Sequence, residues 1–184
     1  MFYEMNVAGL TRQLPLCRVS DPLYIGAFVI FGDVELTVAC ARDLLKKAPE
    51  YDVLITAESK GIPLVYEMAR QNNDPKYLIA RKAPKLYMKD IFSTEVNSIT
   101  TAKTQVLCID GEDAAYMKGK RVIIVDDVIS TGESLKAVEK LVRKAGGEVV
   151  ARMAILAEGD AKDREDIIYL EKLPLFNADG TEKE

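Results

Sequence analysis

The sequence has no histidine and no tryptophan among its 184 residues. The missing histidine removes the most frequent general base of enzymes and the most frequent metal ligand. Any proton transfer must therefore use carboxylates, lysine, tyrosine, backbone groups or water. The chain also lacks a dense cluster of metal-binding side chains, so we expect no metal site built by the protein alone.

Cysteine is scarce as well, with Cys17, Cys40 and Cys108 scattered singly and no CxxC spacing. An odd number of isolated cysteines without a signal peptide indicates reduced thiols, so we expect a cytoplasmic protein. No apolar run approaches the ~20 residues that cross a bilayer, so we expect no membrane partner. The net charge of −4 argues against a general nucleic-acid surface.

What the chain does contain is a stretch from Arg121 to Ser134 that combines a strand, two acids, a turn and a helix. Val122 to Val125 has the β-branched composition of a buried central strand, and Asp126 and Asp127 follow it directly. Small and hydroxyl residues then precede a helical pattern over 135–144. Backbone N–H groups of such a turn, together with those that open the helix, favour a bound anion. The alternative is an ordinary helix cap made by Ser130 or Thr131, but a cap does not explain two carboxylates at the end of a buried strand.

The stretch I-I-V-D-D-V-I-S-T-G-E-S resembles the signature of type I phosphoribosyltransferases, which bind phosphoribosyl pyrophosphate (PRPP). The resemblance implies that Asp126 and Asp127 are catalytic and hold the ribose hydroxyls. It also implies a Mg²⁺ ion that is bound with PRPP. Glu133 stands where many members have a small residue, so we expect its side chain to turn away from the phosphate. The residues that the resemblance assigns to the 5′-phosphate are Ser130, Thr131, Gly132, Glu133 and Ser134.

A second strand, loop and helix occupy Val53–Ile55, the loop from Thr56 to Pro63 and the helical pattern over 64–71. A bland capped turn would account for the loop, because a lone Lys-Gly pair is weak evidence. The segment E-S-K-G resembles the pyrophosphate loop of the family, with lysine where adenine-using members commonly carry arginine. The resemblance assigns Ser59, Lys60 and Gly61 to pyrophosphate, although lysine offers charge without a bidentate fork.

Three further cations, Arg81, Lys82 and Lys85, follow the strand predicted at Tyr77–Ala80. Strand character over Phe92–Ile99 and a strand over 106–110 suggest two crossing strands with a long hairpin tip. The segment R-K-A-P-K-L resembles the opening of the mobile loop that folds over PRPP and shields the reacting sugar from water. The three cations would then face pyrophosphate oxygens. The alternative is that they are solvated charges on a surface hairpin.

Strands that alternate with helices predict an α/β fold with a parallel sheet, here the type I phosphoribosyltransferase fold with a small hood and a mobile β-hairpin loop. We expect a single domain over residues 1–184, with its core at about 33–158. The hood would come from about 10–28, with 158–176 as a second candidate segment. We expect Arg18 and Tyr24 of this hood to hold a flat purine base.

The remaining elements are expected as follows. Strands are predicted at Leu14–Val19, Tyr24–Phe31 and Val149–Ala157. A helix is predicted at about Val34–Lys47 with Asp33 as its N-cap. Residues 113–118 are expected to form a short connection, and the last eight residues are expected to fray.

Taken together, these features predict a purine phosphoribosyltransferase that converts adenine and PRPP to AMP and pyrophosphate, and that forms a homodimer. The closing segment I-I-Y-L-E-K-L-P-L-F and E-S-K-G resemble adenine phosphoribosyltransferase. Other segments resemble xanthine phosphoribosyltransferase and the related domain of a purine-responsive repressor, whose DNA-binding domain we do not expect in front of this α/β pattern. A xanthine, hypoxanthine or guanine phosphoribosyltransferase, or a non-catalytic PRPP-binding regulator, therefore stays open. The proton acceptor is also open, with Asp127 and Glu95 as candidates.

Overall fold

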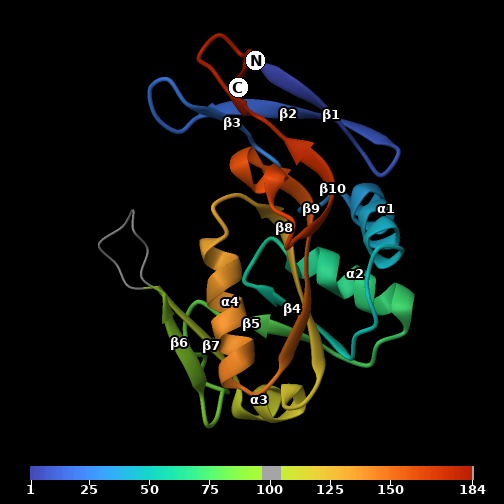
Figure 1. Cartoon of the computed structure of the whole chain (residues 1–184), viewed down its shortest axis with the longest axis vertical. Coiled ribbons are helices and arrows are strands. Elements are labelled where there is room, and N and C mark those ends of the chain that lie inside the picture. The colour runs from blue at the N-terminus through green and yellow to red at the C-terminus, as the bar shows by residue number, and fades with distance from the viewer. Residues whose placement is uncertain (97–104, 184) are drawn as a thin grey trace.

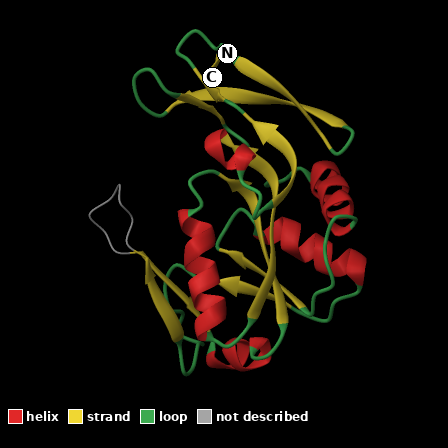
Figure 2. Ribbon diagram, in the orientation of Figure 1, coloured by secondary structure: helices red, strands yellow, loops and turns green. Residues whose placement is uncertain are grey.

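The computed structural model describes residues 1–96 and 105–183 and is built around a parallel sheet of five strands (Figures 1 and 2). The strand order is β10-β9-β8-β4-β5, and every neighbouring pair in it is parallel. The two central runs predicted from β-branched residues, β4 and β8, lie next to each other in the middle of the sheet. The strands span Val53–Ala57 (β4), Tyr77–Ala80 (β5), Arg121–Ile129 (β8), Glu148–Glu158 (β9) and Ile168–Leu173 (β10).

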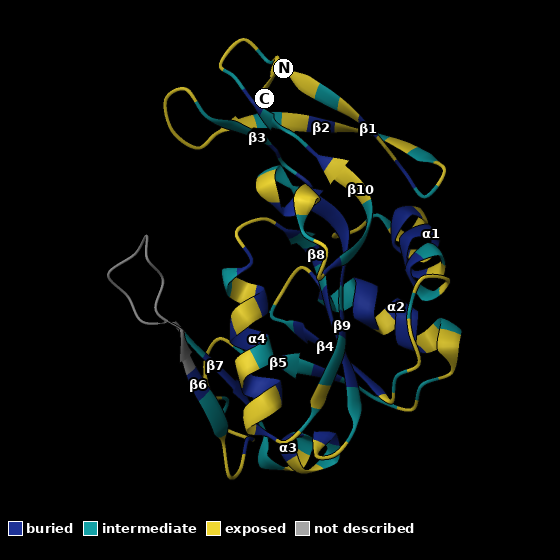
Figure 3. Cartoon of the chain, in the orientation of Figure 1, coloured by how far each residue is buried: buried dark blue, intermediate teal, exposed yellow. Residues whose placement is uncertain are grey.

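Helices cover both faces of this sheet, and each face has its own apolar core. Helices α1 (Val34–Leu45) and α2 (Ile62–Asn72) pack on one face, and α3 (Gly111–Met117) and α4 (Glu133–Lys144) pack on the other. Figure 3 shows β4 and the upper part of β9 in the colour of buried residues, whereas the edge strand β10 is mostly intermediate or exposed. Strands buried on both faces need apolar residues at successive positions, which explains the uninterrupted run in β8.

A second sheet, antiparallel throughout, combines the two ends of the chain in the order β1-β2-β3-β11-β12. Only Pro174 separates the end of β10 from β11, so this sheet lies beyond the carboxyl edge of the parallel sheet (Figure 1). The sheet therefore stands over the edge where α/β proteins bind ligands. Its strands are Phe2–Val7 (β1), Leu10–Arg18 (β2), Tyr24–Gly26 (β3), Leu175–Phe176 (β11) and Glu182–Lys183 (β12).

The predicted hairpin is present as the antiparallel pair β6 (Phe92–Val96) and β7 (Gln105–Ile109). The tip, and with it the part of the predicted strand beyond residue 96, lies outside the described residues. The α/β fold with its parallel sheet is confirmed. Among the described residues, no helix is long and apolar enough to cross a membrane.

Several element boundaries differ from the predictions. The predicted strand Tyr24–Phe31 ends at Gly26, which is the last of its residues that pairs with β2. Residues 111–117 form helix α3 rather than part of a plain connection, with Asp110 accepting a hydrogen bond from the Glu112 N–H. The last eight residues were expected to fray, yet two of them, Glu182 and Lys183, form β12, and β1 at the other end of the chain was not predicted. The Asp33 cap is confirmed, since its carboxylate accepts from the Leu36 N–H at 3.0 Å.

Candidate active site

The acidic pair lies inside β8 rather than after it, which corrects the predicted strand end at Val125. Pairing with β4 stops at Ile124, whereas pairing with β9 continues through Asp126 as far as Ile129. One side of the strand is thus left without a neighbour where the two carboxylates stand. Asp127 is buried and Asp126 is half-buried. Two acids are therefore held rigidly at the carboxyl edge of the sheet, facing a cavity.

The surroundings of Asp126 favour its protonated form. Burial, followed by the charge of Asp127, raises the pKa of Asp126 to about 7. One of its oxygens, Oδ1, accepts a hydrogen bond from the Asp127 N–H at 2.9 Å. A cation or a set of hydroxyl donors placed between the two acids would offset their repulsion.

Lys60 supplies one such cation from the neighbouring loop. Its Nζ lies 2.9 Å from Oδ2 of Asp127, while its own side chain stays 45% exposed. The direction of approach does not satisfy hydrogen-bond geometry, so this buried oxygen has no hydrogen-bond partner among the described residues. A ligand can use this oxygen as an acceptor once Lys60 moves away from it.

The turn after β8 opens α4 without a side-chain cap. Gly132 occupies the N-cap position in a left-handed conformation, with φ +77°. Of the two predicted capping hydroxyls, only that of Thr131 approaches a helix N–H, that of Glu133, at 3.5 Å. The N-cap residue therefore has no capping side chain, and apart from the long hydrogen bond of the Glu133 N–H to Thr131, the N–H groups that open the helix are available to an anion.

A cavity of about 390 Å³ joins this turn to the acidic pair and to the loop after β4. Its volume lies in the range of small-molecule sites. A smaller adjoining cavity of about 120 Å³ is lined by Asp126 and every residue from 128 to 135. Of the residues assigned from the sequence to phosphates and ribose, those that line the larger cavity are Ser59, Lys60, Lys82, Asp126, Asp127, Thr131, Glu133 and Ser134.

Gly61 contributes space rather than a lining group. A Cβ atom added there would lie 2.1 Å from Oγ1 of Thr56 and 3.4 Å from the carbonyl oxygen of Val125. Its φ of −71° is an ordinary value, so glycine is required for the close approach alone. The loop after β4 can thus lie directly against β8, which brings Lys60 to the acidic pair.

The loop after β5 sends only one of its three assigned cations to the cavity. Lys82 lines it, whereas Arg81 lines a neighbouring cavity and donates to the hydroxyl of Tyr87 at 2.9 Å. Lys85 lines neither of these cavities. In the described structure Arg81 and Lys85 are therefore not gathered with the acidic pair.

Glu58 is a lining residue that the sequence-based assignment missed, although it begins the E-S-K-G segment. Its carboxylate accepts from the Lys82 N–H at 3.0 Å and lies 3.5 Å from the Arg81 guanidinium. The Lys82 N–H is the main cause that lowers the pKa of Glu58. Glu58 thus connects the loop after β4 to the loop after β5, and no local sequence pattern predicts this role.

The residues proposed for the base lie in the second sheet. Arg18 ends β2 and pairs with Asp21, and Tyr24 begins β3 opposite Phe176. Neither lines the cavity that contains the acidic pair. The side chain of Glu95, one candidate for the proton acceptor, lies outside the described residues.

Comparison with known proteins gives concordant results. The family described as "Phosphoribosyl transferase domain" matches residues 34–177. A hypoxanthine/guanine phosphoribosyltransferase of Methanococcus voltae is 31% identical over 162 residues, covering 88% of this chain and 82% of that protein. An adenine phosphoribosyltransferase of Acetivibrio thermocellus is 30% identical over 153 residues, covering 79% and 84%.

Solved structures of adenine phosphoribosyltransferases share the fold. The enzyme of Thermoanaerobacter pseudethanolicus has a TM-score of 0.65 at 23% identity, covering 94% of this chain and 95% of that one. The enzyme of Saccharomyces cerevisiae has a TM-score of 0.62 at 19% identity, covering 92% of each. The similarity includes the second sheet as well as the parallel one, because it extends over nearly the whole chain.

Proposed function

The chain belongs to the phosphoribosyl transferase family, and on that premise we propose that it transfers the phosphoribosyl group of PRPP to a purine, with adenine as the first choice of base. The products would be AMP and pyrophosphate. The observation that carries the proposal is the single cavity that brings together the two acids of β8, the uncapped turn before α4 and Lys60. These three features match the ribose, the 5′-phosphate and the pyrophosphate of PRPP.

Each part of the cavity has a distinct electrostatic role. The N–H groups around Gly132 favour a phosphate, since they are not capped and stand at the positive end of α4. Asp126 and Asp127 offer acceptors to ribose hydroxyls. When pyrophosphate leaves the sugar, positive charge develops on the ribose ring, and two nearby carboxylates stabilise it.

Lys60 would change partner during binding. In the described structure it neutralises Asp127, but it is nearly half exposed and its long side chain can turn. A pyrophosphate group carries more negative charge than one carboxylate, so it would draw the ammonium away. Asp127 would then be available to the ribose hydroxyls when PRPP is in place.

The residues present also fit a Mg²⁺ ion that arrives with PRPP. Mg²⁺ in phosphate-transfer sites uses one or two carboxylates together with substrate oxygens, rather than a cage of protein ligands. The described residues contain no group of three or more acidic or cysteine ligands, whereas Oδ2 of Asp127 is a buried acceptor without a hydrogen bond. Asp126 and Asp127 would face the ion, which would neutralise charge on the departing pyrophosphate.

Two kinds of purine are candidates for the acceptor base. Adenine is supported by the resemblance of the closing segment to adenine phosphoribosyltransferase. It is also supported by two solved adenine phosphoribosyltransferases whose folds match this one over more than nine tenths of each chain. Hypoxanthine or guanine is the second candidate, supported by the identity to the Methanococcus voltae protein. The homodimer stays a prediction, which light scattering of the purified protein would test.

The test is a PRPP- and Mg²⁺-dependent assay of pyrophosphate release, with adenine, hypoxanthine, guanine, xanthine and orotate offered separately. Release with adenine alone would support the proposal in full. Release with an oxopurine alone would keep the reaction and replace the base. If PRPP bound but no base released pyrophosphate, the protein would be a PRPP-binding regulator instead.

A further inference from the structure

Arg164 places its guanidinium directly against the turn that opens α4. A Cβ atom added to Gly132 would lie 2.3 Å from Nη1 of Arg164, much closer than any real contact. The guanidinium therefore occupies the space that a side chain at position 132 would fill. Glycine at position 132 suits the left-handed backbone, and its lack of a side chain leaves the space that the guanidinium occupies.

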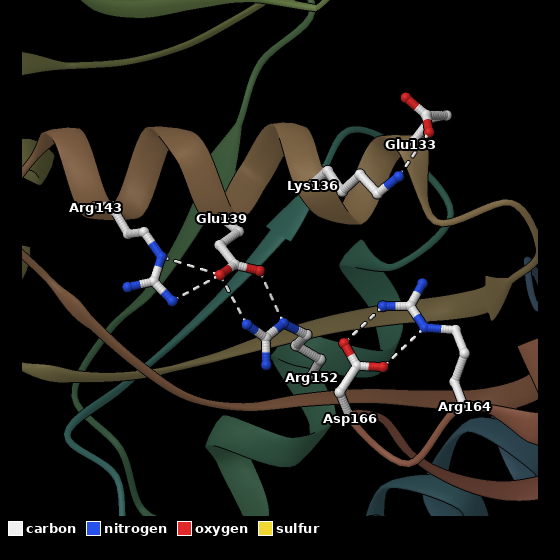
Figure 4. Close-up of polar contacts among 7 residues, drawn as sticks. All are labelled: Glu133, Lys136, Glu139, Arg143, Arg152, Arg164 and Asp166. Carbon is white, nitrogen blue, oxygen red and sulfur yellow. Dashed lines mark hydrogen bonds and ion pairs between the residues drawn. The ribbon is translucent and has the colours of Figure 1, made fainter.

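Asp166 fixes the direction of that guanidinium. It accepts from Nε and from Nη2 of Arg164, both at 2.8 Å, which is a bidentate charge-assisted pair. Figure 4 shows that the pair leaves the third nitrogen, Nη1, directed toward the turn before α4. Since Arg164 follows the short helix η1 (Gly159–Asp163), the pair belongs to the connection between β9 and β10.

A second bidentate pair lies beside the first along α4. Glu139 accepts from Arg152 through both carboxylate oxygens, at 2.7 and 2.8 Å, and also from the more exposed Arg143 (Figure 4). Glu139 thus offsets the charge of Arg152, which would otherwise repel Arg164. Two arginines can then remain close to the same helix without either being left unpaired.

We propose that Arg164 is a positioning residue for the 5′-phosphate of the phosphoribosyl substrate and acts through the turn at Gly132. The inference rests on the proposed function, because it takes residues 130–134 as the phosphate site. Arg164 lines neither cavity of that site, so it stands behind the turn rather than in it. From there it holds the turn in place and adds positive charge behind the N–H groups that face the phosphate.

Calorimetric titration with two separate probes, ribose 5-phosphate and pyrophosphate, tests this role, because only the first carries a 5′-phosphate. For Arg164→Gln we expect the dissociation constant for ribose 5-phosphate to rise about tenfold. The KM for PRPP should rise in proportion while the affinity for pyrophosphate and the kcat stay as they are. Arg164→Lys, which keeps the charge but loses the fork, should show a smaller loss. Arg143→Gln is the matched control, since Arg143 lies at the other end of α4, and it should change neither affinity.

Unchanged ribose 5-phosphate affinity in Arg164→Gln would overturn the inference, as would equal losses for both probes together with a lower Tm. If that variant does not fold, Asp166→Asn provides the test, because Arg164 keeps its charge and loses only the carboxylate that orients its guanidinium. We expect Asp166→Asn to raise the dissociation constant for ribose 5-phosphate about threefold without changing that for pyrophosphate. A dissociation constant for ribose 5-phosphate equal to that of the unaltered protein would again overturn the inference. Failure of the proposed function is a separate result: if the cavity is not a PRPP site, the unaltered protein binds neither probe, and if the protein binds PRPP without catalysis, it binds both probes but releases no pyrophosphate with any base.

Discussion

Nζ of Lys60 lies 2.9 Å from Oδ2 of Asp127, so the protein itself places a cation beside the acid that is expected to hold the ribose hydroxyls. The pair connects the loop after β4 to the middle of β8, two segments far apart in the chain. It also links two roles that the resemblance treats separately, the pyrophosphate loop and the acidic pair. Substitutions of Asp127 and Lys60 should therefore affect different parts of PRPP, the ribose and the pyrophosphate.

Asp127→Asn should lower kcat by at least about 100-fold with little effect on the fold. The substitution keeps the size of the side chain and removes the repulsion between the two acids, so the Tm should stay the same or rise slightly. Steady-state kinetics and thermal unfolding of the same preparation provide the measurement. A collapse of Tm that parallels the loss of activity would count against a catalytic role.

Lys60→Met should raise the KM for PRPP about tenfold and weaken pyrophosphate binding to a similar extent. Ribose 5-phosphate should bind as before, because it lacks the pyrophosphate group. Lys60→Arg should bind pyrophosphate more tightly than Lys60→Met, since the guanidinium group keeps the positive charge and can donate to two oxygens at once. Calorimetry with both ligands would decide, and a loss confined to ribose 5-phosphate would contradict the assignment.

The raised pKa of Asp126 should appear in the pH dependence of stability. Its folded pKa of about 7 exceeds the ordinary value of 3.8, so between these values the folded state binds more protons at this group than the unfolded state. The stabilisation from Asp126 is therefore complete at low pH and is lost as pH rises through 7. Compared with Asp126→Asn, the unaltered protein should lose unfolding free energy as the pH rises from about 4 to about 7 in urea titrations, and little more above that. A difference between the two proteins that does not vary with pH would refute this.

Gly61→Ala should destabilise the fold by about 1–3 kcal/mol and raise the KM for PRPP, because the new methyl group meets Oγ1 of Thr56. The backbone at Gly61 is not strained, so the effect is purely steric. Adding Thr56→Ala removes the nearest clashing atom and should restore part of both losses. Denaturant unfolding of the two single variants and the double variant gives the coupling energy, and strictly additive effects would disprove the contact.

Local patterns were enough to predict the centre of the site. The stretch from Arg121 to Ser134 carries its strand, its acids and its turn within a few residues, and the hydrophobic periods on either side indicate a strand and a helix without reference to the rest of the chain. The parallel sheet and the Asp33 cap follow from the same kind of evidence. The small residues and N–H groups of the turn before α4 indicated an anion by themselves, whereas the assignment of positions 59–61 to pyrophosphate came from the resemblance to the phosphoribosyltransferase family.

Tertiary structure alone decided which charges reach the cavity. Arg81, Lys82 and Lys85 are equivalent cations in the sequence, but Glu58 binds the Lys82 N–H and only Lys82 lines the cavity with the acidic pair. Arg164 lies in a segment rich in charged residues, and its guanidinium lies against Gly132.

The sequence by itself therefore determined the fold class and the order of strand, acidic pair, small-residue turn and helix, because local backbone conformation follows from neighbouring residues. The long-range ion pairs, the sheet made from both chain ends and the placement of Arg164 depend on how distant segments pack. A charged side chain looks the same in a sequence whether water or a carboxylate surrounds it.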